Sequence, residues 1–237
     1  MIRSGSTVQY QIAAELVEMK GLGRRVEWID ESNHAIEIPK RDSDELLVFK
    51  SHAFTPTIAE EFEKNNAKAL YIYRDLRDVA VSHSQKYEMP ISAIIDKDLI
   101  GGAIMQYHNW TSSGNVLISR YEDLVRNLHA HISDIASFTG IGLSNDEILA
   151  VAEKFSPENQ IKTIEDAVKS NRLTSLNNVS FDSRNLLHTD HISPDRGKIN
   201  KWKEHFKEDE LAIFEEKYGA WLIDHGYELK NPGIYDN

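Results

Sequence analysis

The sequence predicts an α/β fold in which helices flank a parallel sheet. Three short runs rich in Val, Ile, Leu, Tyr and Phe lie at residues 46–50, 69–74 and 116–120, and a weaker fourth lies at residues 25–29. Each run is too short for a core helix, and helical patterns separate it from the next. Strands that alternate with helices are typical of a doubly wound parallel sheet.

The expected helices have recognisable ends. Thr55-Pro56 supplies an N-cap residue followed by proline at the first helical position. Residues 122–138 carry apolar side chains at helical spacing and are predicted to form one helix that stops before Gly140. Ser144 begins a sequence with the spacing of a capping box, and residues 208–225 are predicted to form the last long helix.

A polar segment interrupts these patterns at residues 171–195. It has little periodicity, and structureless segments above ~12–15 residues are usually functional or disordered. We therefore expect a mobile loop or lid at about residues 169–195. At ~100–200 residues per domain, the 237 residues are expected to form one domain that spans the whole sequence, 1–237.

Composition excludes several classes of protein. There are no cysteines, which excludes a disulfide framework, a thiolate metal site and a cysteine nucleophile. The 27 basic and 38 acidic side chains give a formal charge of −11, which disfavours non-specific nucleic-acid binding. No apolar run approaches the ~18–20 residues needed to span a bilayer. We expect a cytoplasmic protein without a membrane or nucleic-acid partner; the sequence does not indicate its oligomeric state.

The first candidate site is the run RSGST at residues 3–7, directly before an amphipathic helical pattern at residues 8–19. A glycine-containing turn that opens a helix presents free backbone N–H groups, and here Arg3 and two hydroxyl groups accompany them. This is a pattern that binds phosphate, although an ordinary N-capped surface turn is the alternative. It is not a Walker A motif, because no lysine follows Gly5.

Two further candidates lie where predicted strands end. Lys50 and His52 follow the run LLVF, and Arg74 follows ALYIY with Ser82 two helical turns later. Ligands of open parallel sheets bind outside the carboxyl ends of the strands, and arginine suits phosphate because its planar group donates two parallel hydrogen bonds. The alternatives are a solvated lysine beside a loop histidine, and a surface ion pair between Arg74 and Asp75 or Asp78.

The last two candidates are weaker alone. Tyr121 follows the run VLISR, and Arg196-Gly197 precedes Trp202-Lys203 in a basic loop. Four of the five candidates lie at a strand's carboxyl end or at a strand-to-helix turn, where one parallel sheet would bring them together.

Together these motifs resemble the PAPS-dependent sulfotransferases, whose donor is 3′-phosphoadenosine 5′-phosphosulfate (PAPS). The resemblance runs from residue 3 to about residue 228. RSGST at residues 3–7 resembles the family's 5′-phosphosulfate loop, and YIYRDLRDVAVSHSQKY resembles its 3′-phosphate segment. KSH at residues 50–52 is similar to the stretch that carries the family's catalytic base. RYEDL resembles the strand end on the adenine side, and the Arg196-Gly197 region resembles the loop that closes over the nucleotide.

The resemblance implies a P-loop-like sulfotransferase fold and a role for each motif. His52 would be the general base, and Lys50 and Arg3 would stabilise charge on the bridging and 5′-phosphate oxygens. The implied nucleotide-binding residues are Arg3, Ser4, Gly5, Ser6, Thr7, Arg74, Ser82, Tyr121, Arg196 and Gly197. The co-substrate would be PAPS, the product 3′-phosphoadenosine 5′-phosphate (PAP), and no metal would be required.

The sequence departs from the family pattern at four places. Arg3 stands where lysine is usual, and Val8 replaces the aromatic residue that often stacks on adenine. Asp195 replaces an arginine of many members, which leaves Arg196 as the candidate for the 3′-phosphate. Only Met1-Ile2 precedes the phosphosulfate loop, so the first strand is expected to be shortened or missing.

The sequence therefore predicts an enzyme that transfers a sulfuryl group from PAPS to a hydroxyl or amine of a small molecule. The acceptor pocket is expected from residues 88–109 and 171–195. Two alternatives stay open: a P-loop kinase of small molecules, which would need Mg²⁺, and a catalytically silent PAP-binding protein.

Overall fold

The computed structural model describes residues 1–26, 28–39, 44–170, 174–176, 179–182, 186–188 and 197–231. Within these ranges, each helix is too short or too polar to cross a bilayer.

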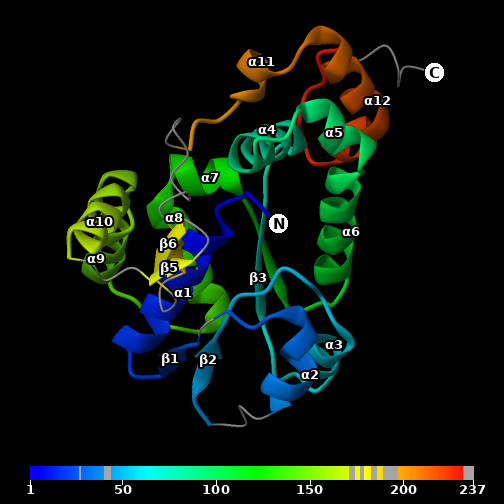
Figure 1. The fold of residues 1–237 in the computed structure, drawn as a ribbon. Helices are drawn as coiled ribbons and strands as arrows, with labels where there is room; N and C mark the ends of the chain where they lie inside the picture. The colour runs from blue at the N-terminus through cyan, green and yellow to red at the C-terminus, as the bar shows by residue number, and fades with distance from the viewer. Residues whose placement is uncertain are drawn as a thin grey trace.

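Parallel strands form the centre of the molecule, as predicted (Figure 1). β1 (Gly23–Arg25) pairs with β2 (Leu46–Val48), and β3 (Ala69–Tyr73) pairs with β4 (Val116–Arg120). Within the described residues these pairs are separate, with no hydrogen-bonded strand between β2 and β3. Residues 1–5 form no strand, in agreement with the expected shortening.

The chain nevertheless begins against β3. The Met1 ammonium group donates a hydrogen bond to the carbonyl of Ile72 at 2.7 Å, and the Ser4 hydroxyl contacts the same oxygen at 2.9 Å. The loop that opens the first helix is therefore fixed beside the carboxyl end of β3.

Helices cover both faces of the β3–β4 pair (Figure 1). In chain order the helices are α1 (Ser6–Met19), η1 (Glu31–Asn33), α2 (His34–Glu37), α3 (Pro56–Glu63), α4 (Leu76–Tyr87), α5 (Ile91–Asp96), α6 (Leu99–Thr111), α7 (Tyr121–Arg126), α8 (Leu128–Thr139), α9 (Asn145–Lys154), α10 (Pro157–Lys169), α11 (Trp202–His205) and α12 (Glu208–Asp224). On β3, Leu70 packs with the apolar core of α1, α8 and α9, whereas Tyr71 and Tyr73 pack with that of α4, α5, α6 and α12. This alternation is what the period of two in a strand requires.

One predicted helix is wrong. Residues 121–139 form two helices, α7 and α8, which meet at Asn127. Asn127 has an extended φ of −146°, and its side chain accepts a hydrogen bond from the backbone N–H of Ala130. Because asparagine is a strong N-cap residue, a new helix begins there. The capping box of Ser144 and Glu147 is confirmed.

Part of the predicted loop at residues 171–195 is ordered into strands. β5 (Thr174–Leu176), β6 (Val179–Asp182) and β7 (Leu187–His188) form an antiparallel sheet. The remaining residues between 171 and 195, apart from 186, lie outside the described residues. The role of this segment as a lid stays a prediction.

Candidate active site

The loop before α1 has the backbone of a tight turn. Arg3 and Gly5 have φ values of 55° and 82°, both in the left-handed region, and Gly5 is the N-cap residue of α1. Ser4 is fully buried, and its hydroxyl contacts the carbonyl oxygens of Met1 and Ile72, so this side chain holds the fold together. The first N–H groups of a helix have no partner within the helix, so those of α1 are suited to donate to a ligand.

Arg3 connects this loop to α4. Its Nε donates a hydrogen bond to the Ser82 hydroxyl at 3.0 Å, and Ser82 is buried two turns into α4. The phosphosulfate-like loop and the segment that resembles the 3′-phosphate site are thus in direct contact, as predicted from the sequence.

Lys50 lies on the other side of the same loop. It follows β2, and its Nζ donates to the Thr7 hydroxyl at 2.7 Å. Burial, together with the positive charges of Lys86 and Arg3, lowers the pKa of Lys50 to about 8. This ammonium group is therefore poorly solvated and surrounded by like charge, an environment that favours binding of an anion.

His52 is two residues further along. Burial, followed by the charge of Lys50, lowers the pKa of His52 to about 3, so the imidazole is neutral at pH 7. The backbone carbonyl of His52 accepts a hydrogen bond from Trp110 Nε1 at 3.2 Å. The ring meets Trp28 edge to face, with the ring centroids 5.1 Å apart.

Arg74 leaves β3 and is almost completely buried. Its Nη2 donates to Asp78 at 3.0 Å and to the carbonyl of Lys198 at 2.7 Å, and its guanidinium stacks over the ring of Tyr121 at 4.2 Å. The alternative of an ion pair with Asp78 is therefore present. Among the described residues, no partner accepts a hydrogen bond from the buried Nε of Arg74, so this oriented donor is available to a ligand.

Tyr121 is the point where the separate motifs meet. Its hydroxyl donates to the carbonyl of Gly197 at 3.1 Å. A Cβ atom built on Gly5 would lie 3.0 Å from the Tyr121 ring, and one built on Gly197 would lie 2.5 Å from its hydroxyl. Because neither glycine has a side chain, the backbone at both positions can approach Tyr121, the ring on which Arg74 stacks.

The loop after Gly197 is fixed to the start of α4. Asp78 accepts hydrogen bonds from the backbone N–H groups of Asn200 and Trp202 at 2.9 and 3.0 Å. Burial raises the pKa of Asp78, and the charge of Arg74 opposes this shift. One carboxylate therefore holds both Arg74 and the loop that follows Gly197.

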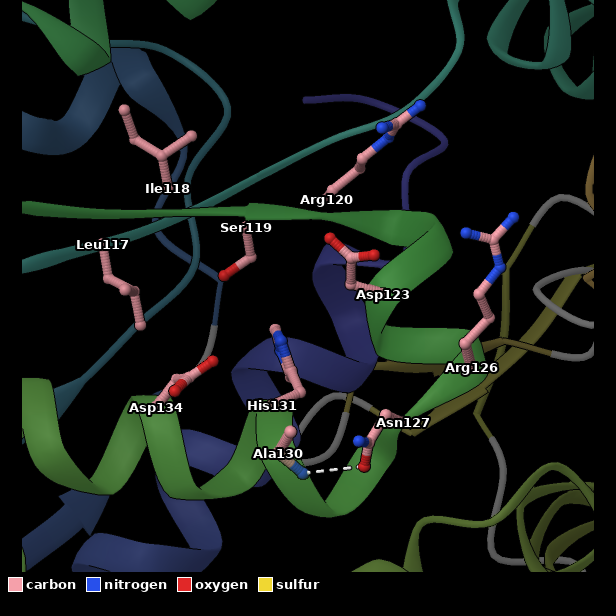
Figure 2. A pocket seen from close by; sticks show the side chains of 10 residues that line it. All are labelled: Leu117, Ile118, Ser119, Arg120, Asp123, Arg126, Asn127, Ala130, His131 and Asp134. Carbon is pink, nitrogen blue, oxygen red and sulfur yellow. Dashed lines mark hydrogen bonds between the residues drawn. The ribbon is translucent and has the colours of Figure 1, made fainter. Parts of the chain in front are cut away.

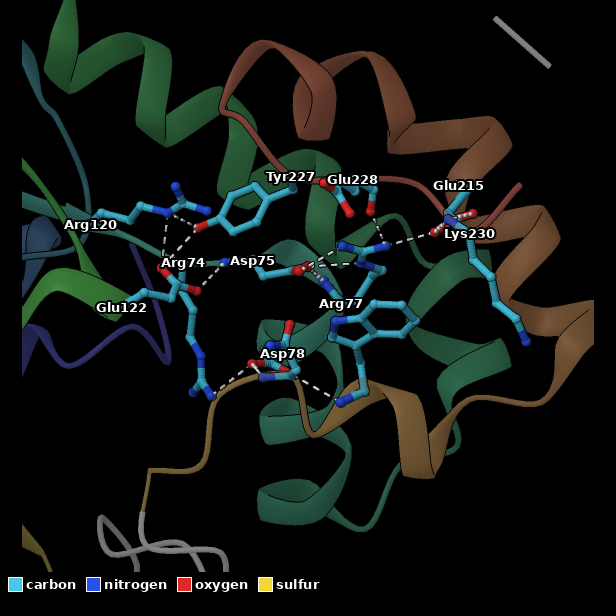
Figure 3. Close-up of polar contacts among 12 residues, drawn as sticks. Arg74, Asp75, Arg77, Asp78, Arg120, Glu122, Glu215, Tyr227, Glu228 and Lys230 are labelled. Carbon is cyan, nitrogen blue, oxygen red and sulfur yellow. Dashed lines mark hydrogen bonds and ion pairs between the residues drawn. The ribbon is translucent and has the colours of Figure 1, made fainter. Parts of the chain in front are cut away.

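A buried ion network supports this arrangement (Figure 3). Arg77 donates to Asp75 at 2.8 Å, to Glu215 of α12 at 2.7 Å and to the carbonyl of Glu228. Its guanidinium lies 3.8 Å from the ring centre of Trp202. The network joins the first turn of α4, α11 and α12 into one support beside Arg74.

Most of the predicted site residues come together, with three qualifications. Arg196 lies outside the described residues. Ser4 contributes its hydroxyl to the fold. Val8 packs with the core of α1 and α8, so this position presents no ring for base stacking.

The structure adds a residue that the motifs did not indicate. Trp28 is 40 % exposed although it is large and apolar, and it lies against the ring of His52. The residues around Trp28 in the sequence form no motif that would indicate a site. The position of Trp28 depends on how the segment after β1 packs beside β2.

Two cavities lie elsewhere. One, of about 350 Å³, lies between β4 and the α7–α8 region and is lined by Ser119, Asp123 and His131 (Figure 2). The other, of about 560 Å³, borders the Arg77 network near Trp202 and Tyr227. Arg3, Lys50 and His52 line neither. In the part of the chain that the structure describes, no cluster of three His, Asp or Glu residues is arranged to hold a metal ion.

Comparison with known proteins identifies the family. The sulfotransferase domain model matches residues 3–226. The chain belongs to the sulfotransferase domain family. The resemblance seen in the sequence is confirmed, and so is the prediction of an enzyme of the sulfotransferase class with an α/β fold.

Individual relatives are distant. An amine sulfotransferase of Oryctolagus cuniculus is 24 % identical over 216 residues, which is 84 % of this chain and 68 % of that protein. A 3-beta-hydroxysteroid sulfotransferase of Cavia porcellus is 25 % identical over 219 residues, 82 % of this chain and 69 % of that protein.

Solved structures share the fold. Mouse sulfotransferase SULT7A1 complexed with PAP has a TM-score of 0.68 at 19 % identity, covering 95 % of this chain and 83 % of that one. Retinol dehydratase in complex with androsterone and PAP has a TM-score of 0.63 at 16 % identity, covering 97 % and 81 %.

Proposed function

We propose that this sulfotransferase moves a sulfuryl group from PAPS to a hydroxyl or amine of a small molecule, with His52 as the general base. The observation that carries the proposal is the meeting of five segments of the chain in one place. Arg3 contacts Ser82, Lys50 contacts Thr7, and Tyr121 contacts Gly5, Arg74 and Gly197. These segments are distant in the sequence and resemble the two phosphate ends of one nucleotide site.

The residues present fit such a nucleotide. The buried Nε of Arg74, which has no hydrogen-bond partner within the described ranges, is a donor suited to a phosphate oxygen, and Ser82 supplies a hydroxyl on the helix that follows Arg74. At the other end, backbone N–H groups of Gly5, Ser6 and Thr7 begin a helix whose dipole favours negative charge. Two phosphate-binding ends distinguish PAPS from ATP-like donors.

The reaction assigned to these groups is an in-line displacement at sulfur. The bond between sulfur and the bridging oxygen of the 5′-phosphate breaks as the acceptor oxygen or nitrogen bonds to sulfur. The acceptor's proton passes to the His52 imidazole, and PAP leaves. Lys50 and Arg3 stabilise the negative charge that develops on PAP, which is the role of oriented cations in a poorly solvated site.

The environment of His52 suits a base that must start neutral. Burial and the charge of Lys50 keep the proton off the ring before the donor binds. An anionic nucleotide offsets these positive charges and raises the pKa of His52 towards the range in which imidazole accepts a proton. General-base catalysis of this kind contributes roughly 10²–10⁴-fold.

The acceptor class follows from the relatives and from Trp28. The relatives' names refer to an amine and to a 3-beta-hydroxysteroid, both small molecules. The half-exposed indole of Trp28 beside His52 supplies an apolar wall at which such a molecule would present its reacting group.

A binding and transfer experiment tests the proposal. Thermal unfolding is measured with PAP, ATP, and ATP plus Mg²⁺; a ligand at ~100-fold its dissociation constant adds about 2.7 kcal/mol. PAPS is then supplied with phenols, aliphatic alcohols and amines, and sulfated product is detected by mass. Stabilisation by ATP plus Mg²⁺ alone would favour a kinase. PAP binding without product from any acceptor would favour a silent protein.

The base is tested separately. His52→Ala is expected to keep PAP binding and to lose at least ~10²-fold in transfer rate. His129→Ala, at an exposed position on α8, is the control. Transfer by His52→Ala at the wild-type rate would exclude His52 as the base.

A further inference from the structure

The segment between β1 and α3 contains a buried histidine that the proposed mechanism does not use. His34 begins α2 and is 1 % exposed, whereas its neighbours in η1 and the rest of α2 are not buried. A fully buried polar ring is unfavourable unless its nitrogens find partners, so its hydrogen bonds indicate what it holds.

Both ring nitrogens of His34 have partners. Nε2 lies 3.3 Å from the carbonyl oxygen of Ile29 and 3.2 Å from the Ser51 hydroxyl, and Nδ1 lies 2.9 Å from the Thr55 hydroxyl. A carbonyl only accepts, so Nε2 carries a proton. The Ser51 hydroxyl donates its own hydrogen to the carbonyl of Ala53 at 3.2 Å, which leaves its oxygen free to accept from Nε2.

These contacts hold the loop of residues 50–55 near both of its ends. Ser51 lies between Lys50 and His52, and Thr55 is the N-cap residue of α3. The Thr55 side chain makes no capping hydrogen bond to α3, and its hydroxyl contacts His34. The Thr55 side chain is therefore linked to α2 and does not cap its own helix.

The loop has few other polar attachments of this kind. The carbonyl of His52 accepts from Trp110, and the N–H of Phe54 donates to Gln106 at 3.1 Å. Both attachments come from α6. His34 holds the opposite side, so the backbone between Lys50 and Phe54 is fixed between α2 and α6.

We propose that His34 is a positioning residue: through Ser51 and Thr55 it holds the loop that presents Lys50 and His52 for sulfuryl transfer. The inference rests on the proposed function. A displacement of about 1 Å in a reacting group can reduce a rate on the order of 10²-fold, so loss of this link is expected to lower kcat strongly. In the proposed site PAP is held mainly by Arg3, Arg74 and Ser82, which His34 does not touch, so loss of the link should lower kcat more than PAP affinity.

Four variants separate positioning from simple core packing. The Nε2 of glutamine reaches about as far as the histidine Nε2, so His34→Gln keeps a donor for Ser51. The amide of asparagine lies near the position of Nδ1, so His34→Asn keeps the contact with Thr55 and loses that with Ser51. His34→Leu fills the space and loses both, and Ser51→Ala removes the partner.

For each variant, kcat, the KM for PAPS and PAP-dependent thermal stabilisation are measured, and the ring resonances of His52 are recorded by NMR. The inference predicts a kcat loss of ~10–10²-fold in His34→Leu, His34→Asn and Ser51→Ala with a much smaller loss of PAP binding, and substantial recovery of kcat in His34→Gln. The His52 resonances should shift in the first three variants and stay near wild type in the fourth.

Equal losses of PAP binding and kcat, or no difference between His34→Gln and His34→Leu, would overturn the inference in favour of packing alone. Wild-type protein that transfers no sulfuryl group would instead contradict the proposed function. The NMR comparison then still decides whether His34 holds the loop, because it does not depend on turnover.

Discussion

Arg3 Nε donates a hydrogen bond to the hydroxyl of Ser82 at 3.0 Å, although the two residues are 79 positions apart. One belongs to the loop before α1 and the other to the buried face of α4. The contact joins the two segments proposed to bind opposite ends of the same nucleotide.

Ser82→Ala should weaken PAP binding. The Ser82 oxygen accepts from Arg3, and its hydrogen can still donate to a phosphate oxygen. A hydrogen bond to a charged group contributes about 1.5–3 kcal/mol, so its loss should raise the Kd at least roughly 10-fold. Ser84→Ala, on the same helix but without a comparable link to Arg3, is the matched control. Calorimetric titration with PAP measures both. Equal affinities of the two variants would exclude Ser82 from the site.

Gly197→Ala should weaken PAP binding through Tyr121. The new methyl group would lie 2.5 Å from the Tyr121 hydroxyl, so the ring that carries Arg74 has to move. A φ of 77° adds backbone strain of about 1–2 kcal/mol. Gly140→Ala, at φ 81° with nothing within 4 Å of its added Cβ, measures that strain alone.

The double variant Tyr121→Phe/Gly197→Ala decides the cause. Without the hydroxyl, the nearest ring atom to the new methyl group is 3.8 Å away, an ordinary contact. The affinity loss of the double variant should therefore be smaller than the sum of the two single losses. Strict additivity would indicate that Gly197 and Tyr121 act independently.

The sequence predicted the parts of this site that depend on local patterns. Arg3, Lys50, Arg74 and Tyr121 were found because each follows a recognisable strand or precedes a helix, and parallel strands bring such positions to one edge. The two-helix break at Asn127 was missed, because apolar spacing continues across it and only the capping asparagine marks the boundary.

Other parts of the site could not be predicted in this way. Trp28 and His34 lie in a segment without a strong period, and their roles arise from contacts with residues 51–55 across the fold. In the part of the chain that the structure describes, the strands form two separate pairs because β2 and β3 share no ladder of backbone hydrogen bonds. The apolar pattern of a strand does not indicate which neighbouring strand it pairs with.

The pH dependence of activity should come from the ionisation of Lys50. A fall in activity below about pH 6.5, as expected for a histidine with its ordinary pKa, should be absent. The pKa of Lys50 is about 8 in the free protein, so kcat/KM for PAPS should fall above pH 8 as this ammonium group loses its proton. The pKa of His52 is about 3, so the base stays neutral down to weakly acid pH.

In the unfolded chain this histidine binds a proton at higher pH, so its burial makes the protein less stable as pH falls from about 6.5 towards 3.

Lys50→Arg tests the basic limb. Arginine keeps its proton throughout this range, so the fall in kcat/KM above pH 8 should disappear even if the rate itself is lower. The measurement is a pH profile with PAPS below its KM. A basic limb at the same pH in the variant would assign it to another group.

Trp28→Ala should raise the KM for the acceptor more than it changes PAP binding. An aromatic contact contributes about 0.5–1.5 kcal/mol beyond area burial, which corresponds to roughly 2- to 10-fold. Trp28→Phe should recover part of the loss because it keeps a ring beside His52. Leu149→Ala, at an exposed apolar position on α9, is the control. Unchanged acceptor kinetics in Trp28→Ala would remove the indole from the acceptor site.

Arg77→Met should destabilise the whole protein and weaken PAP binding indirectly. Arg77 is 2 % exposed and compensates the buried carboxylates of Asp75 and Glu215, so its loss leaves both without their guanidinium partner. Removing one member of a buried ion pair costs about 3–5 kcal/mol. Urea unfolding should show this loss. Arg24→Met breaks an exposed pair with Glu45 and should cost less than about 1 kcal/mol.

The same network positions the nucleotide site, which gives Arg77→Met a second effect. Asp75 caps the start of α4 by accepting a hydrogen bond from the backbone N–H of Arg77. The Arg77 guanidinium stacks on the ring of Trp202, and the backbone N–H of Trp202 donates to Asp78. Loss of Arg77 therefore loosens the carboxylate that orients Arg74. PAP affinity should fall at temperatures where the variant is still folded by circular dichroism, whereas Arg24→Met should bind PAP as wild type does. A destabilised Arg77→Met with wild-type PAP affinity would mean that the network supports the fold without orienting Arg74.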